Sequence, residues 1–257
     1  MANDSMNEFV SYVKNGVQAG DPTVIGILVA VVVGLLTLVI FAFLSGKQNK
    51  RRGVLLLGIC DAGKTLLFSR LVYKAYKETY TSTKSNSGSY TVADTNKSLR
   101  VIDLPGHERL RFQTMEDNKG LARAIIFVID SLNFQKEIKE VAELLYTALS
   151  DSTISSLAPP ILIVCNKQDM TLAKGPKVIQ GQLEKEMNTL RVTRSAALQG
   201  TDNISNNNTY LGKRNKDFEF SDVKPFKITF AECSCKGKGD NSKADLSEVE
   251  SWLCKVA

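Results

Sequence analysis

The segment GICDAGKT, residues 58–65, has the residue types and spacing of a loop that binds phosphate. Its glycines allow a tight turn in which backbone N–H groups converge on phosphate oxygens at the positive end of the following helix. Lys64 would neutralise the outer phosphates of a nucleotide, and the Thr65 hydroxyl would bind Mg²⁺. The residues that we predict to contact the phosphates are Gly58, Ile59, Cys60, Asp61, Ala62, Gly63, Lys64, Thr65 and Leu66.

A second segment, DLPGHE at residues 103–108, has the residues to complete a metal and phosphate site. Asp103 ends an apolar run with a strand pattern, where a carboxylate would hold Mg²⁺ through water. Gly106 would offer its N–H to a γ-phosphate. A DxxG pattern alone arises easily by chance, but its position downstream of the phosphate loop strengthens the prediction.

Two later segments have the chemistry to select a guanine base. In NKQD, residues 166–169, Asp169 would accept hydrogen bonds from guanine's N1–H and exocyclic amine, which adenine lacks. Lys167 would lay its alkyl stem on the ring, and Asn166 would brace the neighbouring loops. Alone, this pattern also fits a strand-to-helix turn with a capping Asp. Ser234 and Cys235, in SCK, follow the last apolar run, where a backbone N–H would reach guanine's O6.

These motifs follow short apolar runs that alternate with helical patterns, which predicts a mostly parallel sheet covered on both faces. The candidate strands are residues 54–58, 89–93, 99–103, 124–130, 161–166 and 227–233. The candidate helices are residues 65–77, 134–150, 176–190 and 244–256. The second and third strands are separated by a short polar turn, so we expect a hairpin with one antiparallel edge strand. A polar stretch, residues 193–217, predicts a mobile surface insertion.

In their order and strand context, these motifs resemble the small GTPase family of the P-loop class, over residues 54–257. The resemblance implies GTP and Mg²⁺ as ligands, and a loop after the first helix whose threonine closes on the metal and the γ-phosphate. Spacing from Thr65 favours Thr81 or Ser82 for this role, and both stay open. The nucleotide contacts implied for this loop are Thr79, Tyr80, Thr81 and Ser82, and the implied metal ligands are Thr65, Asp103 and Thr81.

Two positions depart from the common pattern of that family. His107 follows the DxxG glycine, where Ras-like members usually carry a glutamine that orients the attacking water. A neutral imidazole would orient water or accept its proton, which makes His107 the candidate catalytic residue. The alternative is that His107 packs aside and hydrolysis is slow without help. Cys235 replaces the usual alanine of SAK, and a contact made by its backbone N–H survives that change.

An apolar stretch without any charge, residues 24–44, precedes the phosphate loop. As a helix it would extend about 31 Å, close to the ~30 Å hydrocarbon thickness of a bilayer. Basic residues at 47 and 50–52 follow it and an acidic segment precedes it, which predicts that the C-terminal part is cytosolic. The predicted organisation is a lumenal N-terminus (1–23), a transmembrane helix (24–44), a basic linker (45–53) and a GTPase domain (54–257).

The composition supports this organisation and weighs against other classes of protein. A chain of 257 residues suffices for one sizeable domain with an appendage. The net charge of +6 is modest, and its densest cluster lies beside the apolar stretch, so we expect no direct binding of nucleic acid. Five cysteines and a single histidine do not form a zinc-finger pattern, and reduced thiols in the cytosol fit best.

The whole arrangement is similar to the β subunits of the signal recognition particle receptor, particularly in DLPGHERLR and LEKEMNTLRVTRSAA. This resemblance implies a GTP-binding subunit, fixed in the endoplasmic reticulum membrane, that holds the receptor's α subunit for co-translational protein targeting. It also implies indirect contact with the ribosome and translocon, and slow GTP hydrolysis that a partner stimulates. The alternative is a membrane-tethered trafficking GTPase of the Arf or Sar type with full hydrolytic cycling.

Overall fold

A computed structural model describes residues 19, 22–48, 52–92, 97–198, 210–237 and 243–257. The chain divides into two units, residues 1–50 and residues 51–257. In the first unit, the helix α2 (Pro22–Gln48) contains the predicted transmembrane stretch. Positions 24, 28 and 41–44 of that stretch lie outside the residues whose side chains are described, as do positions 49–51 of the predicted linker. Within the described residues, no helix meets the length and apolarity required to cross a membrane.

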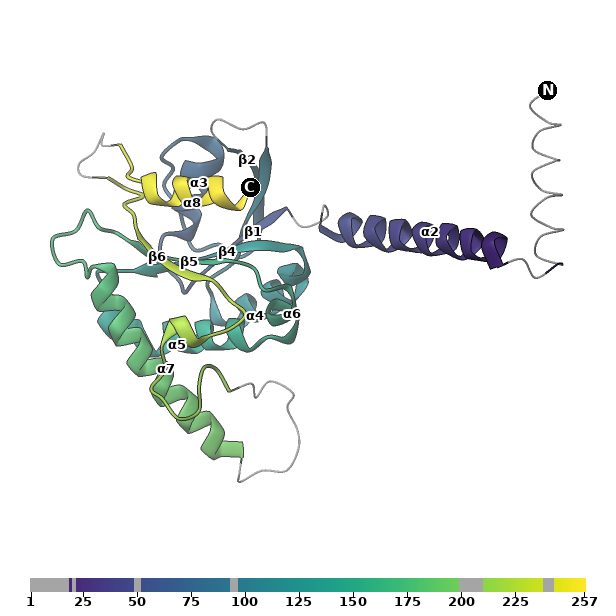
Figure 1. Ribbon diagram of the computed structural model, residues 1–257. Helices are drawn as coiled ribbons and strands as arrows, with labels where there is room; N and C mark the ends of the chain where they lie inside the picture. The colour runs from purple at the N-terminus through teal and green to yellow at the C-terminus, as the bar shows by residue number, and fades with distance from the viewer. Residues whose placement is uncertain (1–18, 20–21, 49–51, 93–96, 199–209, 238–242) are drawn as a thin grey trace. The chain divides into compact units, whose positions relative to one another are not determined.

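The second unit is built on a six-stranded sheet in the order β2-β3-β1-β4-β5-β6, seen in Figure 1. Only the β2–β3 pair is antiparallel, as predicted for the hairpin, and all other neighbours are parallel. The strands are β1 (Gly53–Leu57), β2 (Asn86–Thr91), β3 (Ser98–Asp103), β4 (Ala122–Asp130), β5 (Ile161–Asn166) and β6 (Ile228–Glu232). The predicted α/β class and sheet are therefore confirmed.

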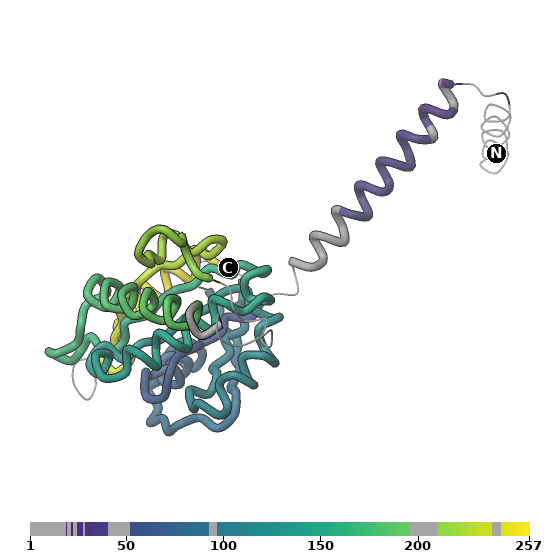
Figure 2. The backbone as a smooth tube through the Cα atoms, turned by 90° about the horizontal axis from the view of Figure 1, so that it is seen from below, coloured from purple at the N-terminus to yellow at the C-terminus, as the bar shows by residue number. Residues whose placement is uncertain are grey.

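Helices cover both faces of this sheet because its central strands are apolar on both sides. In β1, Leu55 and Leu57 pack into one core and Val54 and Leu56 into the other, as the alternation of side chains along a strand requires. Figure 1 shows the two helical layers, one on each side of the sheet, and Figure 2 shows the same backbone turned by 90° and seen from below. One layer holds α3 (Lys64–Tyr73) and α8 (Ser247–Val256), and the other holds α4 (Glu108–Asn118), α5 (Phe134–Ser150), α6 (Ser152–Leu157) and α7 (Pro176–Leu198).

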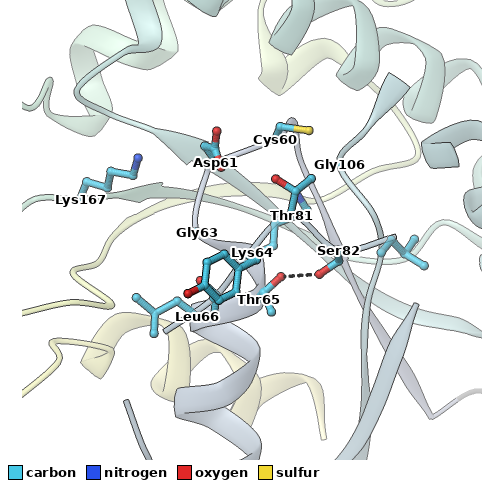
Figure 3. Close-up of a pocket in the computed structure, with 13 residues that line it drawn as sticks. Cys60, Asp61, Gly63, Lys64, Thr65, Leu66, Thr81, Ser82, Gly106 and Lys167 are labelled. Carbon is cyan, nitrogen blue, oxygen red and sulfur yellow. Dashed lines mark hydrogen bonds between the residues drawn. The ribbon is translucent and has the colours of Figure 1, made fainter. Parts of the chain in front are cut away.

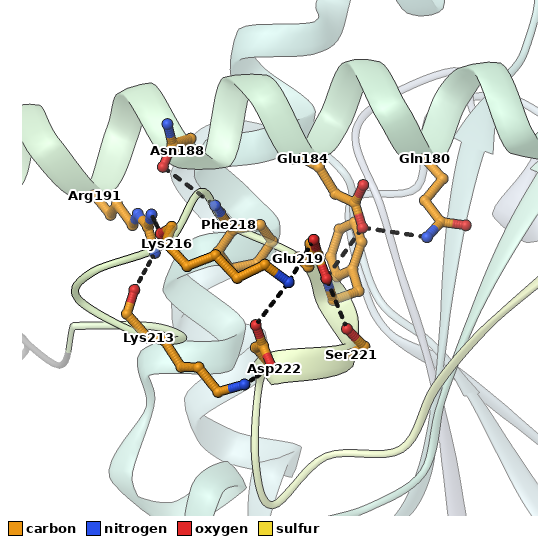
Figure 4. A network of polar contacts seen from close by, with 11 residues as sticks. Gln180, Glu184, Asn188, Arg191, Lys213, Lys216, Phe218, Glu219, Ser221 and Asp222 are labelled. Carbon is orange, nitrogen blue, oxygen red and sulfur yellow. Dashed lines mark hydrogen bonds and ion pairs between the residues drawn. The ribbon is translucent and has the colours of Figure 1, made fainter.

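The helix α7 continues eight residues past its predicted end at position 190, so residues 193–198 are helical rather than loop. Its buried Arg191 donates hydrogen bonds to the carbonyls of Leu211, Lys213 and Lys216 in the segment that returns to the sheet. Figure 4 shows Arg191 with Lys213 and Lys216, beside an ion pair between Lys213 and Asp222. The helix is therefore held by partners distant in sequence. Residues 199–209 of the predicted insertion lie outside the described part.

Two helices were not predicted because neither has an apolar period. The helix α4 is mostly polar, and its buried residues are Arg111 and Met115. The helix α6 is short and begins where the Asp151 carboxylate accepts the Ile154 N–H at 2.9 Å. Asp151 also pairs with Lys119 at 2.7 Å, so side-chain contacts rather than an apolar stripe set this helix.

Candidate nucleotide-binding site

The phosphate-loop motif forms the turn between β1 and α3, as its sequence predicts. Gly58 has φ +144°, and a Cβ placed on it would lie 2.4 Å from the carbonyl oxygen of Val128. Gly63 has φ +92°, a conformation that glycine adopts readily and other residues rarely. Asp61 is also left-handed, with φ +56°. The loop therefore has the tight backbone that converging N–H groups require.

Lys64 is buried inside this turn, with 6% of its surface exposed. Its Nζ donates to the carbonyl oxygen of Ile59 at 2.6 Å, so the ammonium lies against the loop itself. Burial lowers the pKa of Lys64, and the nearby Asp103 carboxylate opposes that shift. A phosphate group beside Lys64 would favour the charged ammonium in the same way as Asp103, but with more negative charge.

Oxygen atoms from three different segments meet at the start of α3. The Thr65 hydroxyl donates to Asp103 Oδ2 at 2.9 Å, and the Ser82 hydroxyl lies 3.0 Å from Thr65 Oγ1. The Thr65–Ser82 contact is the dashed line in Figure 3. Asn86, the first residue of β2, also donates to Asp103 Oδ2, at 3.4 Å. The phosphate loop, the end of β3 and the loop before β2 therefore share one polar cluster.

This cluster fits Mg²⁺ by the chemistry of its donors. Asp103 is fully buried, and its Oδ1 has no hydrogen-bond partner within the described part of the chain. Burial raises the pKa of Asp103, against the opposing effects of the Thr65 hydrogen bond and the Lys64 charge. A free carboxylate oxygen beside two hydroxyls is the hard-oxygen environment that Mg²⁺ prefers. Thr65, Ser82 and Asp103 are the residues that would hold the metal, directly or through water.

A cavity of about 190 Å³ opens over the phosphate loop. A Cβ on Gly106 would lie 2.5 Å from Lys64 Nζ and 2.7 Å from Cys60 N, so only glycine allows DLPGHE to pack this closely against the loop. The predicted residues that line the cavity are Cys60, Asp61, Gly63, Lys64, Thr65, Leu66, Thr79, Tyr80, Thr81, Ser82, Gly106 and Lys167. Leu104 also lines it and was not predicted.

The loop from residue 79 to residue 82 contributes unequally to the site. Of the two candidates for the metal, Ser82 has its hydroxyl against Thr65, while Thr81 lines the cavity and makes no hydrogen bond to that cluster within the described part of the chain. Tyr80 lines the same cavity, with 84% of its surface exposed. The geometry therefore favours Ser82 as the residue that links this loop to the metal cluster.

His107 lies at the start of α4 rather than in the cavity wall. Its Nδ1 accepts the backbone N–H of Arg109 at 3.3 Å, which makes His107 the N-cap of that helix. The residue is exposed, and it is not among the described residues that line the cavity. In this arrangement one ring nitrogen is engaged with the helix, and Nε2 is the one that would face water.

The predicted base-reading residues form a second cluster, which Asn166 organises. Asn166 is the last residue of β5, and its Nδ2 donates to Ala62 O at 2.8 Å. Its Oδ1 accepts the Cys235 N–H and the Cys233 thiol, both at 3.2 Å. The amide therefore connects the phosphate loop with the segment after β6, so Asn166 braces both loops.

Asp169 and Ser234 are also joined directly, because the Ser234 hydroxyl donates to Asp169 Oδ1 at 2.7 Å. This bond orients one carboxylate oxygen of Asp169 and leaves the other available to a ligand. Lys167 has the left-handed φ of +67° and pairs with Asp130 at 2.7 Å. Motifs far apart in sequence thus meet at one end of the sheet.

Sequence reasoning missed Asp130 and Cys233, which contact the base-reading residues directly. Asp130 ends β4 and Cys233 follows β6, and both lie at the carboxyl ends of parallel strands. Ligand sites of open α/β sheets form at that edge. A polar residue that ends a buried strand was therefore the available signal for Asp130.

Comparison with known proteins places this geometry in a family. The family model "Signal recognition particle receptor beta subunit" matches residues 49–226. The signal recognition particle receptor subunit beta of Mus musculus is 47% identical over 258 aligned positions, which cover 100% of this chain and 96% of the mouse protein.

Solved structures agree with this assignment. "The Structure of the Mammalian SRP Receptor" superposes with a TM-score of 0.70 at 49% identity, over 80% of this chain and 100% of that one. Two structures of the Chaetomium thermophilum protein, a SRb-GTP/SRX complex and a SRb-GDP-Mg form, share the fold at 21% identity with TM-scores of 0.62 and 0.59. They cover 79% and 81% of this chain and 99% of each of those chains.

Among these relatives, the Chaetomium thermophilum structures are named with GTP, GDP and Mg. The family match covers most of the second unit, including the phosphate loop, DLPGHE and NKQD. The mouse relative matches over the whole length of this chain. The chain therefore belongs to the family of signal recognition particle receptor β subunits.

Proposed function

We propose that this chain binds GTP with Mg²⁺ and, in that state, holds the receptor's α subunit at the endoplasmic reticulum membrane. One observation carries the proposal: Thr65, Ser82 and Asp103 bring oxygens from three segments together beside the buried Lys64. Mg²⁺ bound there would neutralise charge on the nucleotide's phosphates. A relative's structure named as a GTP/SRX complex supports a partner bound in the GTP state.

The contacts around this cluster suggest how a nucleotide would control a partner. Ser82 and Gly106 belong to the two loops over the phosphate loop, and each of them lies against it. A γ-phosphate that accepts the Gly106 N–H would draw both loops onto the nucleotide. The exposed side chains of these loops, such as Tyr80, would then form a surface of fixed shape for the α subunit.

Guanine selectivity follows from the second cluster. Asp169 accepts from Ser234 through one oxygen, so its other oxygen is free for guanine's N1–H and amine. The backbone N–H of Cys235 is already bonded to Asn166 Oδ1, which holds the segment after β6 in place. Adenine presents an acceptor at N1 and would face the Asp169 carboxylate unfavourably.

We expect slow intrinsic GTP hydrolysis. His107 Nδ1 is engaged in the N-cap of α4, and the ring does not line the cavity in the described part of the chain. For the imidazole to orient a water molecule, the ring must leave this N-cap hydrogen bond and turn toward the phosphates. A docked partner that stabilised this movement would stimulate hydrolysis.

The membrane anchor in this proposal is the uncharged stretch at residues 24–44, within α2. Most of the described side chains of that helix are exposed and apolar, among them Ile27, Leu38 and Val39, and the Thr37 hydroxyl donates to the carbonyl of Gly34. Residues 45–53 would span at most about 30 Å if fully extended, and they span less because α2 continues to Gln48, so the GTPase unit would stay close to the lipid headgroups. A bound α subunit would thereby be retained at the membrane surface.

Capture of the α subunit by membrane-inserted protein tests the proposal. Reconstituted full-length chain, loaded with GTP or GDP, is mixed with the soluble α subunit, and the bound fraction is measured by vesicle flotation. We expect capture with GTP, little with GDP, and loss of capture in Thr65→Asn. The matched control is Thr193→Asn, on the exposed surface of α7, which should bind like the wild type.

Two results would contradict the proposal. Equal capture with GTP and GDP would show that the nucleotide does not control the partner. Release of the chain from vesicles by alkaline carbonate would show that residues 24–44 do not span the bilayer. Because these measurements are separate, the nucleotide and membrane parts of the proposal can fail independently.

A further inference from the structure

The buried carboxylate of Asp130 contacts the base-reading segment, although it belongs to none of the predicted motifs. Asp130 is the last residue of β4, and 2% of its surface is exposed. Its Oδ2 accepts Lys167 Nζ at 2.7 Å. Lys167 is 31% exposed and lines the cavity, so its side chain stays accessible while its ammonium is paired with Asp130.

The other bonds of Asp130 fix the carboxylate in one orientation. Its Oδ1 accepts the N–H groups of Leu132 and Asn133 at 2.9 and 3.2 Å. Its Oδ2 also accepts Asn133 Nδ2 at 2.8 Å. Burial raises the pKa of Asp130, but the hydrogen bonds from Lys167 and Asn133 outweigh it and leave the pKa below its usual value. An ionised group with four donors has no freedom to rotate away from Lys167.

The backbone of Lys167 is left-handed, with φ +67°. The surrounding loops are tied to the same strand ends. The Ser131 N–H donates to Asn166 O at 3.1 Å, and Gln168 Nε2 donates to Ser131 Oγ at 3.0 Å. The end of β4 therefore holds the NKQD segment at its first three residues.

We infer that Asp130 is a positioning residue for guanine nucleotide binding, which sets the Lys167 side chain in the place where its stem covers the base. This inference rests on the proposed function, and it identifies the Asp130 carboxylate as the group that fixes the position of Lys167. The simpler reading is that Asp130 only shapes the turn before α5. A single substitution tests the two roles, because the backbone N–H groups of the turn bond to Oδ1 and Lys167 bonds to Oδ2, where Asn133 Nδ2 also donates.

The substitution is Asp130→Asn. The new amide oxygen can still accept the Leu132 and Asn133 N–H groups, so the backbone bonds of the turn survive, while the Asn133 Nδ2 bond to the second oxygen is lost. The amide NH₂ then faces Lys167 Nζ, where two donors cannot bond. The matched control is Asp151→Asn, because Asp151 is also buried, caps a turn at 2.9 Å and pairs with a lysine, Lys119, at 2.7 Å.

The experiment measures the dissociation rate of GDP labelled on its ribose from detergent-solubilised full-length chain, together with unfolding in urea. We expect Asp130→Asn to release the nucleotide roughly tenfold faster, and Asp151→Asn to release it at the wild-type rate. Lys167→Met keeps an unbranched stem but removes the ammonium, and it should also accelerate release. The double variant should be no faster than the faster single variant, because both substitutions break the same contact.

Four outcomes would overturn the inference. Multiplied effects in the double variant would show that Asp130 acts separately from Lys167. Wild-type release by Asp130→Asn would show that the turn is its only role. If Asp130→Asn is too unstable to assay, release of the nucleotide at the wild-type rate by Lys167→Met would overturn the inference instead. Failure of the wild-type chain to bind labelled GDP would remove the proposed function itself, and this inference with it.

Discussion

Substitution of Gly63 in the phosphate loop should lower the stability of the fold by an amount that follows from the backbone conformation and the nearest contact. In Gly63→Ala, a Cβ would lie 2.3 Å from Asn166 Nδ2, and the residue would keep φ +92°. A left-handed conformation costs an L-residue about 1–2 kcal/mol. Moving the Asn166 amide would break its 2.8 Å hydrogen bond to Ala62 O, which costs about 1 kcal/mol. Alanine also lowers the conformational entropy of the unfolded chain, which offsets about 0.4–1 kcal/mol of this destabilisation.

The net expectation is that Gly63→Ala lowers the free energy of unfolding by about 2 kcal/mol. With a urea dependence of about 2 kcal/mol per molar, the unfolding midpoint would fall by about 1 M. Trp252 is the single tryptophan and packs against the core, so its fluorescence reports unfolding of the full-length chain in detergent. Nucleotide is left out, so that the change reflects the fold alone.

Gly181→Ala is the matched control and should change stability in the opposite direction. A Cβ on Gly181 would meet nothing within 4 Å, and the residue lies inside α7. Alanine favours a helix over glycine by about 1 kcal/mol. If Gly63→Ala unfolds at the wild-type urea concentration, the close contact between the phosphate loop and Asn166 does not exist as described. If both variants lose stability equally, the effect is not specific to the loop.

Three further predictions follow from the same structure. Asp169→Asn should exchange guanine for xanthine, since an amide can donate to the xanthine oxygen; unchanged preference in competition binding would refute the assigned role. Burial raises the pKa of Cys165 to about 12, so iodoacetamide at pH 8 should label the exposed Cys254 and leave Cys165 unmodified, as peptide mass spectrometry would report. The lowered pKa of Asp130 stabilises the fold above the carboxyl's unfolded pKa, near 4, and this contribution is lost as pH falls through the lower folded value. The difference in unfolding free energy between wild type and Asp130→Asn should therefore be constant from pH 7 to about 5 and shrink below about 4; a difference that grows in acid would contradict it.

Much of the fold was predictable because strong local patterns specify it. Continuous apolar runs such as that of β5 (Ile161–Asn166) are what a strand buried on both faces requires. The strand β1, the phosphate loop and α3 follow in the order that GICDAGKT implies. The helix α4 escaped prediction because it buries mainly Arg111 and Met115, which leaves no apolar stripe to read. Local patterns reveal elements that bury apolar faces, and they miss those held by polar contacts.

By itself, the sequence determined which residues can bind phosphate, metal and base. Each motif is a short run, and its residue types and spacing are enough to identify the part of the ligand that it would bind. Only the tertiary structure decided how the motifs meet. It placed Ser82 rather than Thr81 against Thr65, and it brought Asp130 to Lys167 across 37 positions of chain. Such contacts depend on the register of neighbouring strands, as in the pairing of Asp130 with Asn166. Register is settled by packing over the whole sheet, which no single segment encodes.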